Sequence, residues 1–276
     1  MCLISPEALA RRLDDPALRV LDVRWWLTEP SRGHRDYLTA HLPGAVWVDL
    51  DRDLTAPEGP GRHPLPDPVA FAARMAELGV ANDADVVVYD DAGATIAARL
   101  WWMLDDLGHR SVRVLDGGFV AWSAAGLPVT TAIATPEPGH LTLARRWNRV
   151  IDRATLTSRL GSVALIDVRA HERYRGDLEP VDAYAGHIPT AVNLPLAGSI
   201  GPDGRLLPPD ALRERFAPLG DEVVASCGSG VNACHAALAM RVAGMPAPLL
   251  YEGSYSDWTR CGMPVATGDE PGSMPA

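Results

Sequence analysis

The sequence predicts an α/β protein built from two similar domains, each a mostly parallel sheet with helices on both faces. Two observations support this prediction: short apolar runs alternate with helix-like stretches, and the second half of the chain repeats the first. Alternating strands and helices favour parallel sheets covered on both faces, whose buried strands are apolar along their whole length. With 276 residues, 47% of them hydrophobic, the chain can bury two such cores.

The individual elements are clearest in the second half of the chain. Apolar runs suited to buried strands lie at residues 164–168, 191–194, 223–226 and 248–251. Helices are expected between them, among others at residues 209–216 and 233–243. Because ligands in such sheets bind at the carboxyl ends of the strands, the residues that follow each run are the first candidates for function.

The repeat can be followed residue by residue. Val87-Val88-Tyr89-Asp90-Asp91 matches Val223-Val224-Ala225-Ser226-Cys227. The same offset pairs Gly108 with Gly244, Asp116 with Glu252, Gly117 with Gly253 and Trp122 with Trp258. Leu21-Asp22-Val23-Arg24 also matches Ile166-Asp167-Val168-Arg169, at a larger offset that indicates insertions in loops. Such self-similarity is the mark of a duplicated structural unit.

The repeat and the local composition together predict the domain boundaries. We expect an N-terminal domain at residues 1–131, a linker rich in proline and small residues at 132–148, and a C-terminal domain at 149–267. A flexible tail is expected at residues 268–276. Since Asp91 stands where the other copy has Cys227, we expect the first domain to be the inactive copy and the second to be catalytic.

Cys227 is the strongest functional signal in the chain. It ends an apolar strand-like run, and Gly228, Gly230 and a helix-like stretch follow it. Glycines let backbone N–H groups turn inward around an anion, and a helix N-terminus adds partial positive charge. This setting stabilises a thiolate and predicts an activated sulfur nucleophile. The alternative is a buried cysteine beside glycines that serve a tight turn.

Charge and cysteine content limit the possible partners and compartment. The net charge of −10 argues against nucleic acid or an anionic membrane as a partner, although a local pocket for a small anion is compatible with it. The four cysteines form no Cys-x-x-Cys pair, so no metal site is expected. No signal peptide or membrane-spanning run is visible, and a reducing cytoplasm fits free thiols best.

Several motifs taken together resemble the two-domain rhodanese family, which contains the thiosulfate and 3-mercaptopyruvate sulfurtransferases. The resemblance runs from about Ser5 to Pro264. Its markers are Leu21–Arg24, His41–Ala45, Asp116–Phe119, Gly186–Pro189 and the loop Cys227–Ala233. It implies a tandem of rhodanese domains with a persulfide on the C-terminal cysteine, and neither a metal nor an organic cofactor.

The family chemistry implies a role for the loop that follows the cysteine. Cys227 attacks the donor sulfur, and a small anionic donor leaves as pyruvate or sulfite. The backbone amides of Gly228, Ser229, Gly230, Val231 and Asn232 are expected to hold the outer sulfur of the persulfide. Cyanide, a thiol or a thioredoxin-like protein then removes that sulfur. Ser229 is a candidate donor to the leaving group, or alternatively a residue that stabilises the loop.

The donor is less well defined by the resemblance. Cys-Gly-Ser-Gly-Val is similar to the mercaptopyruvate branch, whereas animal thiosulfate enzymes place two cationic residues after the cysteine. That branch has two substrate-binding arginines nine residues apart; Arg173 matches the first, but Asp182 stands at the second. We therefore expect weak affinity for both donors, with 3-mercaptopyruvate preferred. The alternative for Arg173 is a surface ion pair with Asp167 or Glu172.

Three further polar residues are candidates for the site. His41 and Asp36 are candidates for proton handling, as related mercaptopyruvate enzymes suggest, and His63 lies on a loop expected to border the cleft. The alternative for His41 is a structural role, because His187 repeats it in the other half.

Two other functions fit parts of the pattern. Gly228-x-Gly230-x-x-Ala233 fits a dinucleotide-binding fingerprint, with Glu252 as the ribose-binding acid. A non-catalytic binding module is the other alternative. A Cys-x5-Arg phosphatase is excluded, because Ala233 stands where the arginine must be.

Overall fold

The structure is a computed structural model, and it describes residues 2–274 of the chain. The chain divides into two compact units, neither of which is one continuous stretch of sequence. Unit 1 contains residues 1–55, 66–148 and 200–206, and unit 2 contains residues 56–65, 149–199 and 207–276. Residues 56–65 of the first half therefore belong to the unit that carries Cys227.

Within the described residues, each unit contains one five-stranded sheet, and all strand pairs are parallel. The strand order in unit 1 is β1 (Leu3–Ile4), β5 (Val112–Leu115), β4 (Asp85–Tyr89), β2 (Leu18–Asp22) and β3 (Val46–Trp47). In unit 2 it is β6 (Val150–Ile151), β10 (Leu249–Tyr251), β9 (Val223–Ser226), β7 (Ala164–Asp167) and β8 (Val192–Asn193). The two orders are equivalent, which confirms the repeat and the predicted fold class.

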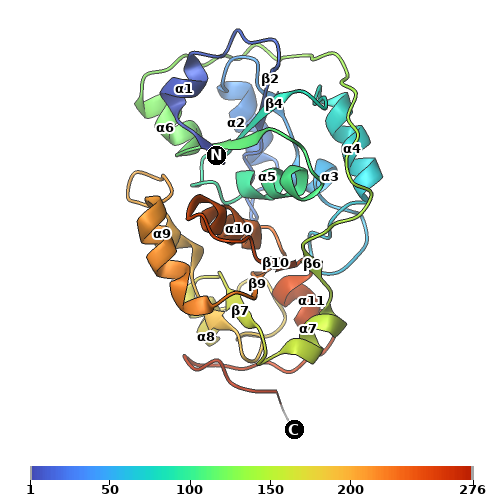
Figure 1. Cartoon of the computed structure of the whole chain (residues 1–276), viewed down its shortest axis with the longest axis vertical. Helices are drawn as coiled ribbons and strands as arrows, with labels where there is room; N and C mark the ends of the chain where they lie inside the picture. Colours follow the sequence, from blue (N-terminus) through green and yellow to red (C-terminus); the bar gives the residue numbers. More distant parts are fainter. Residues whose placement is uncertain (1, 275–276) are drawn as a thin grey trace. The chain divides into compact units, whose positions relative to one another are not determined.

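The helices of unit 1 are named by their order in the chain (Figure 1). They are α1 (Pro6–Ala10), α2 (Arg32–Thr39), α3 (Leu50–Asp53), α4 (Pro68–Glu77), α5 (Ala97–Asp106) and α6 (Gly118–Ala124). Leu9 of α1 and Trp122 of α6 are fully buried in one core cluster with Val20 and Val87 of the central strands. The Trp122 indole also donates a 2.9 Å hydrogen bond to the Pro128 carbonyl, which ties the end of α6 to the following loop.

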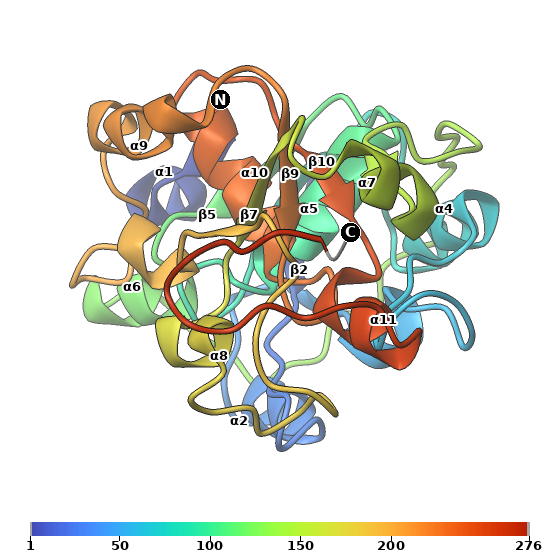
Figure 2. The same cartoon turned by 90° about the horizontal axis from the view of Figure 1, so that it is seen from below.

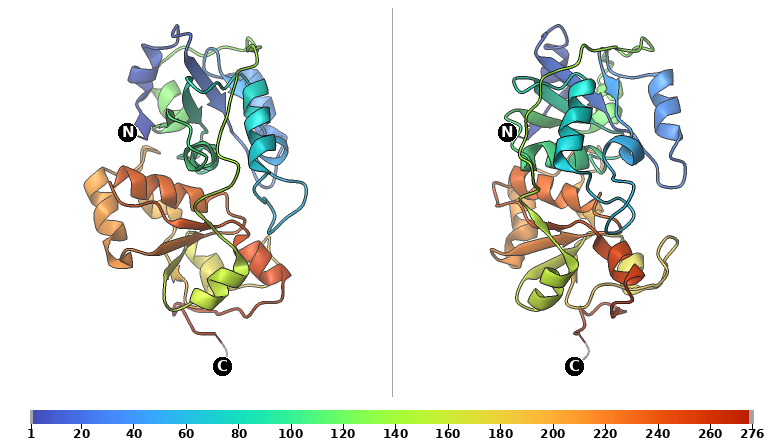
Figure 3. Two further views of the ribbon diagram at one scale, coloured as in Figure 1. Left: turned by 45° about the vertical axis from the view of Figure 1, so that its right-hand side comes forward. Right: turned by 90° about the vertical axis from the view of Figure 1, so that its right-hand side faces the viewer.

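Helices cover both faces of the sheet in unit 2 (Figure 3). They are α7 (Arg153–Arg159), α8 (His171–Arg175), α9 (Pro209–Phe216), α10 (Ala233–Val242) and α11 (Ser254–Arg260), with 3₁₀ turns at Leu196–Ser199 and Ala217–Leu219. Leu156 of α7, Tyr174 of α8 and Trp258 of α11 share a core cluster on one face. The alanine-rich α10 packs on β9 and α9 at the opposite face. The strands and helices predicted for this half are confirmed to within two residues at each end.

The segment after α11 runs back along unit 2 (Figure 2). The Gly268 N–H donates a 2.8 Å hydrogen bond to the Arg175 carbonyl, and the Thr190 N–H donates a 2.7 Å bond to the Pro271 carbonyl. Met274 packs against the core cluster of unit 2. These contacts attach residues 268–274, most of the tail predicted to be flexible, to the domain; the predicted tail at 275–276 lies outside the described residues.

None of the helices in the described part of the chain combines the length and apolar character needed to cross a bilayer.

Candidate active site

Cys227 follows the carboxyl end of β9 and is 3% exposed. The Gly230 N–H points back at its sulfur, with 3.1 Å between the nitrogen and Sγ. The loop then leads into α10, which begins at Ala233. The thiol therefore lies at the carboxyl end of the sheet, the end at which the N-termini of the following helices lie. Backbone N–H groups directed at a cysteine sulfur favour nucleophilic chemistry in general, so this geometry is the one that the candidate role of Cys227 requires.

Gly230 is a position where glycine is required. Its φ is +79°, and a Cβ built on it would lie 2.2 Å from the carbonyl oxygen of Glu252. A side chain would therefore push the loop away from the strand end and remove the N–H group from Sγ. The glycine places one backbone donor on the sulfur of Cys227.

Ser254 also contacts Cys227, and sequence reasoning did not identify it. Its hydroxyl oxygen accepts a 3.0 Å hydrogen bond from the Cys227 N–H, donates to the Tyr251 carbonyl at 2.9 Å and lies 3.9 Å from Sγ. The residue is fully buried and has a φ of +49°, which is uncommon for a residue other than glycine. Ser254 aligns with Gly118 in the repeat. This replacement of a glycine by a serine was the one sign in the sequence that could have pointed to Ser254.

Ser229 and His63, both predicted candidates, meet in unit 2. The Nδ1 atom of His63 lies 2.8 Å from the Ser229 hydroxyl, and both side chains are less than 10% exposed. The segment 56–65 is held in place by two further bonds: the Arg62 N–H donates to the Ser256 hydroxyl, and the Leu65 N–H donates to the Glu252 carboxylate, each at 3.1 Å. The pair forms a hydroxyl–imidazole hydrogen bond two residues beyond the nucleophile.

Arg173 lies in the last turn of α8 and is partly exposed. It does not pair with Asp167 or Glu172, the alternative suggested by the sequence. Instead its guanidinium donates to Glu179 at 2.7 Å and to Asp182 at 3.2 Å. Its nitrogens would lie 3.7 and 3.8 Å from a Cβ at Gly228, so the guanidinium lies next to the loop that follows Cys227.

Val231 and Asn232 complete the loop at the start of α10. Val231 is buried, and the Asn232 side chain makes no capping hydrogen bond to the helix. The carbonyl groups of both residues accept backbone bonds from the first turn of α10, at 3.1 Å each. Their contribution to the site is therefore backbone geometry.

His41 and Asp36 lie in unit 1. The ring of His41 is buried, stacks on Tyr37 at 4.0 Å and has its two nitrogens 2.7 and 3.1 Å from the carbonyls of Tyr37 and Ala132. His187 makes the same contacts in unit 2, stacked on Tyr174 at 3.7 Å. These contacts match the structural alternative for His41. Asp36 is half-buried and pairs with Arg32 on the preceding turn of α2.

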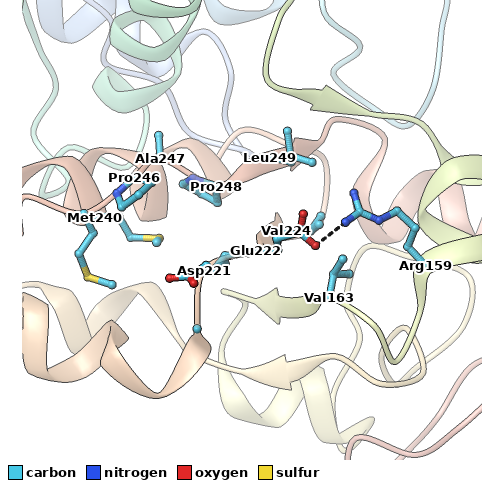
Figure 4. A pocket seen from close by; sticks show the side chains of 13 residues that line it. Arg159, Val163, Asp221, Glu222, Val224, Met240, Pro246, Ala247, Pro248 and Leu249 are labelled. Atoms are coloured by element: carbon cyan, nitrogen blue, oxygen red, sulfur yellow. Dashed lines mark hydrogen bonds and ion pairs between the residues drawn. The ribbon is translucent and has the colours of Figure 1, made fainter.

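A cavity of about 300 Å³ lies at the amino ends of β9 and β10 (Figure 4). Its wall includes the exposed ion pair between Arg159 and Glu222, at 2.7 Å, and the side chains of Met240 and Leu249. Because Cys227 follows the opposite end of β9, this cavity is separate from the thiol. The loop around Cys227, and not the cavity, therefore defines the candidate site.

The fold and the site define a class: a duplicated parallel α/β protein whose second copy carries a buried cysteine facing a loop N–H group. Residues 5–125 and 152–261 both match the rhodanese-like domain. The chain belongs to the rhodanese family, as a two-domain sulfurtransferase, and is an enzyme.

Similar proteins cover almost the whole chain. The probable 3-mercaptopyruvate sulfurtransferase of Pseudomonas aeruginosa is 47% identical over 97% of this chain and 98% of its own length. The thiosulfate sulfurtransferase of Rattus norvegicus is 37% identical over 94% of this chain and 92% of its own. The crystal structure of SseA, a 3-mercaptopyruvate sulfurtransferase from Escherichia coli, has a TM-score of 0.81 and 30% identity, and the match covers 92% of this chain and 98% of SseA. These relatives give no support to the dinucleotide-binding alternative.

Proposed function

We propose that this enzyme takes sulfane sulfur from 3-mercaptopyruvate, and less well from thiosulfate, and carries it as a persulfide on Cys227. The observation that supports this most directly is the Gly230 N–H on the Cys227 sulfur. The His63–Ser229 hydrogen bond beside it supplies a proton-handling pair for a keto-acid leaving group. The thiosulfate branch places two cations after the cysteine, and this chain has Gly228 and Ser229 there.

The first half-reaction forms the persulfide. The Cys227 thiolate attacks the sulfur of 3-mercaptopyruvate, an S–S bond forms, and the carbon–sulfur bond breaks with its electron pair going to the carbon. The resulting pyruvate enolate takes up, at that carbon, the proton lost from the donor's own thiol, relayed through Ser229 and His63, and the persulfide is left as its anion. With thiosulfate, sulfite leaves and no carbon is protonated, so this pair is needed less.

The second half-reaction returns the enzyme to its thiolate. A thiolate acceptor attacks the outer sulfur, the S–S bond breaks, and the acceptor leaves as a persulfide; cyanide leaves as thiocyanate. We propose a small thiol or a reduced thioredoxin-like protein as the acceptor, with no nucleic-acid or membrane partner. The net charge of −10 supports this, and the need for a reduced Cys227 supports a cytoplasmic location.

Replacement of the nucleophile tests the proposal. Cys227→Ser should abolish sulfur transfer from either donor, because a serine oxygen neither ionises in this setting nor carries sulfane sulfur. Steady-state assays with cyanide as acceptor measure the loss, and intact-mass analysis should show one sulfur atom added to the parent by the donor and removed by cyanide. Cys2→Ser and Cys261→Ser are the matched controls and should keep the activity. Substantial turnover by Cys227→Ser would contradict the proposal.

A further inference from the structure

The cavity at the amino ends of β9 and β10 takes no part in the proposed reaction. All of its lining residues belong to unit 2, and Cys227 follows the other end of β9. Its volume is about 300 Å³, which is room for about ten water molecules and lies at the small end of the range of ligand sites. The cavity can therefore hold a small molecule without displacing the sulfur donor.

The inner wall of this cavity is apolar. Val224 and Met240 are 1% and 2% exposed, and Pro248 is buried as well. Met245 and Leu249 are half-buried and continue the wall toward solvent. Methionine side chains are flexible and polarisable, and their sulfur atoms make favourable contacts with aromatic rings. This wall is suited to an aliphatic or aromatic group of a ligand.

The solvent-exposed part of the lining carries charges of both signs. The side chains of Arg159 and Glu222 are 32% and 70% exposed, and the exposed Asp221 also lines the cavity. Figure 4 shows Arg159 and Met240 on opposite sides of the cavity. With one guanidinium and two carboxylates, the lining repels a simple anion and a simple cation alike. A molecule with one charge of each sign and an apolar body matches it.

The ion pair between Arg159 and Glu222 leaves hydrogen-bonding atoms available on both side chains. Nη2 of Arg159 donates to Oε2 of Glu222 at 2.7 Å. Among residues 2–274 this is the one side-chain hydrogen bond of each residue, so Nε and Nη1 of Arg159 and Oε1 of Glu222 have no protein partner there. Exposed ion pairs contribute little to stability. A ligand can therefore bind to both groups at little cost to the fold.

We propose that this cavity is a binding site for a free α-amino acid with an apolar side chain. The carboxylate of the amino acid binds Arg159 and its ammonium group binds Glu222, both through charge-assisted hydrogen bonds. Its side chain lies against Met240 and Met245. The inference goes beyond the proposed function and is independent of it, because no atom of Cys227 takes part.

Three probes with the same aromatic body test the two charged contacts separately. L-Phenylalanine carries both charges, phenethylamine lacks the carboxylate, and 3-phenylpropionate lacks the ammonium group. Isothermal titration of the full chain should show L-phenylalanine binding about tenfold or more tightly than either of the others. Arg159→Gln should weaken L-phenylalanine about tenfold or more without weakening phenethylamine. Glu222→Gln should weaken it by a similar factor without weakening 3-phenylpropionate.

The controls locate the binding and show that the variants are folded. Arg35→Gln, which breaks an exposed pair with Glu29 in unit 1, should leave all three affinities unchanged, and each variant should keep the thermal unfolding midpoint of the parent. Protein alkylated at Cys227 with iodoacetamide should still bind L-phenylalanine. Loss of binding on alkylation would place the ligand at the thiol and overturn the inference. Absence of binding at millimolar L-phenylalanine, or equal weakening of all three probes in either cavity variant, would also overturn it.

Discussion

The loops after β4 and β9 are copies of one another, but their backbone N–H groups are directed at different side chains. In unit 1 the Asp90 carboxylate accepts hydrogen bonds from four backbone N–H groups of its own loop. The donors are Ala92 at 2.9 Å, Ala94 at 3.0 Å, and Ile96 and Ala97 at 2.8 Å each. In unit 2 Ser226 replaces Asp90, and its hydroxyl has no hydrogen-bond partner among the described residues. The Gly230 N–H of that loop points instead at the Cys227 sulfur.

The comparison gives a physical reason for the prediction that the first copy is inactive. In unit 1 the N–H groups of this loop donate hydrogen bonds to the side chain of Asp90. In unit 2 the Gly230 N–H of the equivalent loop points at the sulfur of Cys227. The two units also differ in where a residue other than glycine has a positive φ. Ala94 of unit 1 (φ +69°) aligns with Gly230, and Ser254 of unit 2 (φ +49°) aligns with Gly118. In each unit the residue with the positive φ makes a bond that its own loop needs: Ala94 donates its N–H to Asp90, and Ser254 accepts the N–H of Cys227.

Transfer of the unit 1 carboxylate into unit 2 should have the largest effect. In Ser226→Asp the new carboxylate is expected to take up the loop amides and to repel the thiolate of Cys227. The kcat/KM for either donor should fall about a hundredfold or more, since hydrogen bonds to charged groups are each worth about 1.5–3 kcal/mol. Steady-state assays measure this, with Ser226→Ala as the control of similar size. Parent-like activity in Ser226→Asp would show that the two loops are not interchangeable.

The reverse change should destabilise unit 1. Asp90→Ser removes the acceptor of four backbone N–H groups, three of them in buried hydrogen bonds, so the free energy of unfolding should drop by about 3 kcal/mol or more. Denaturant unfolding of the full chain measures the drop, and no sulfur should be found on unit 1 after incubation with donor. An unchanged unfolding midpoint would mean that water satisfies the loop as well as the carboxylate does.

Asp91, the counterpart of Cys227, should make unit 1 sensitive to pH. Burial, together with the neighbouring Asp90, raises the pKa of Asp91 from 3.8 to about 6. Because the folded pKa lies above the unfolded one, stability is highest below about pH 4 for this group and falls as the pH rises to about 6, by about 2 kcal/mol after allowance for partial exposure. Asp91→Asn should remove this loss, measured as unfolding free energies at pH 4.5 and 7.5. A parent and variant with parallel pH profiles would contradict it.

Ser254 offers the mildest test of the comparison. Ser254→Gly restores the residue found in unit 1 and relieves the positive φ, but it removes the acceptor for the Cys227 N–H. We expect about a tenfold fall in kcat with a stability near that of the parent, because the loss of one bond and the relief of strain offset each other. Ser254→Ala keeps the strain and should be less stable than Ser254→Gly. If Ser254→Gly keeps full activity, the hydroxyl serves only the fold.

Much of the fold was predictable because its signals are local or repeated. The runs at 223–226 and 233–243 carried the right period and length for β9 and α10, and the aligned glycines revealed the duplication. The position of Cys227 between a strand end and a helix was predictable for the same reason, since a strand end followed by glycines and a helix is a contiguous pattern. Ser254 was missed because its backbone angle and its contact with Cys227 are properties of the folded chain.

The sequence by itself determined the α/β class and the duplication, and it singled out Cys227 as the candidate nucleophile, since each depends on residues close together along the chain or on a repeat of them. The tertiary structure decided which charged and polar groups surround that nucleophile. His63 reaches Ser229 across 166 residues, and Arg62 reaches Asp182 across 120. No periodicity specifies such pairs, because they depend on how residues 56–65 pack against the sheet of unit 2. That packing places Asp182 between Arg62 and Arg173, and its carboxylate accepts hydrogen bonds from both.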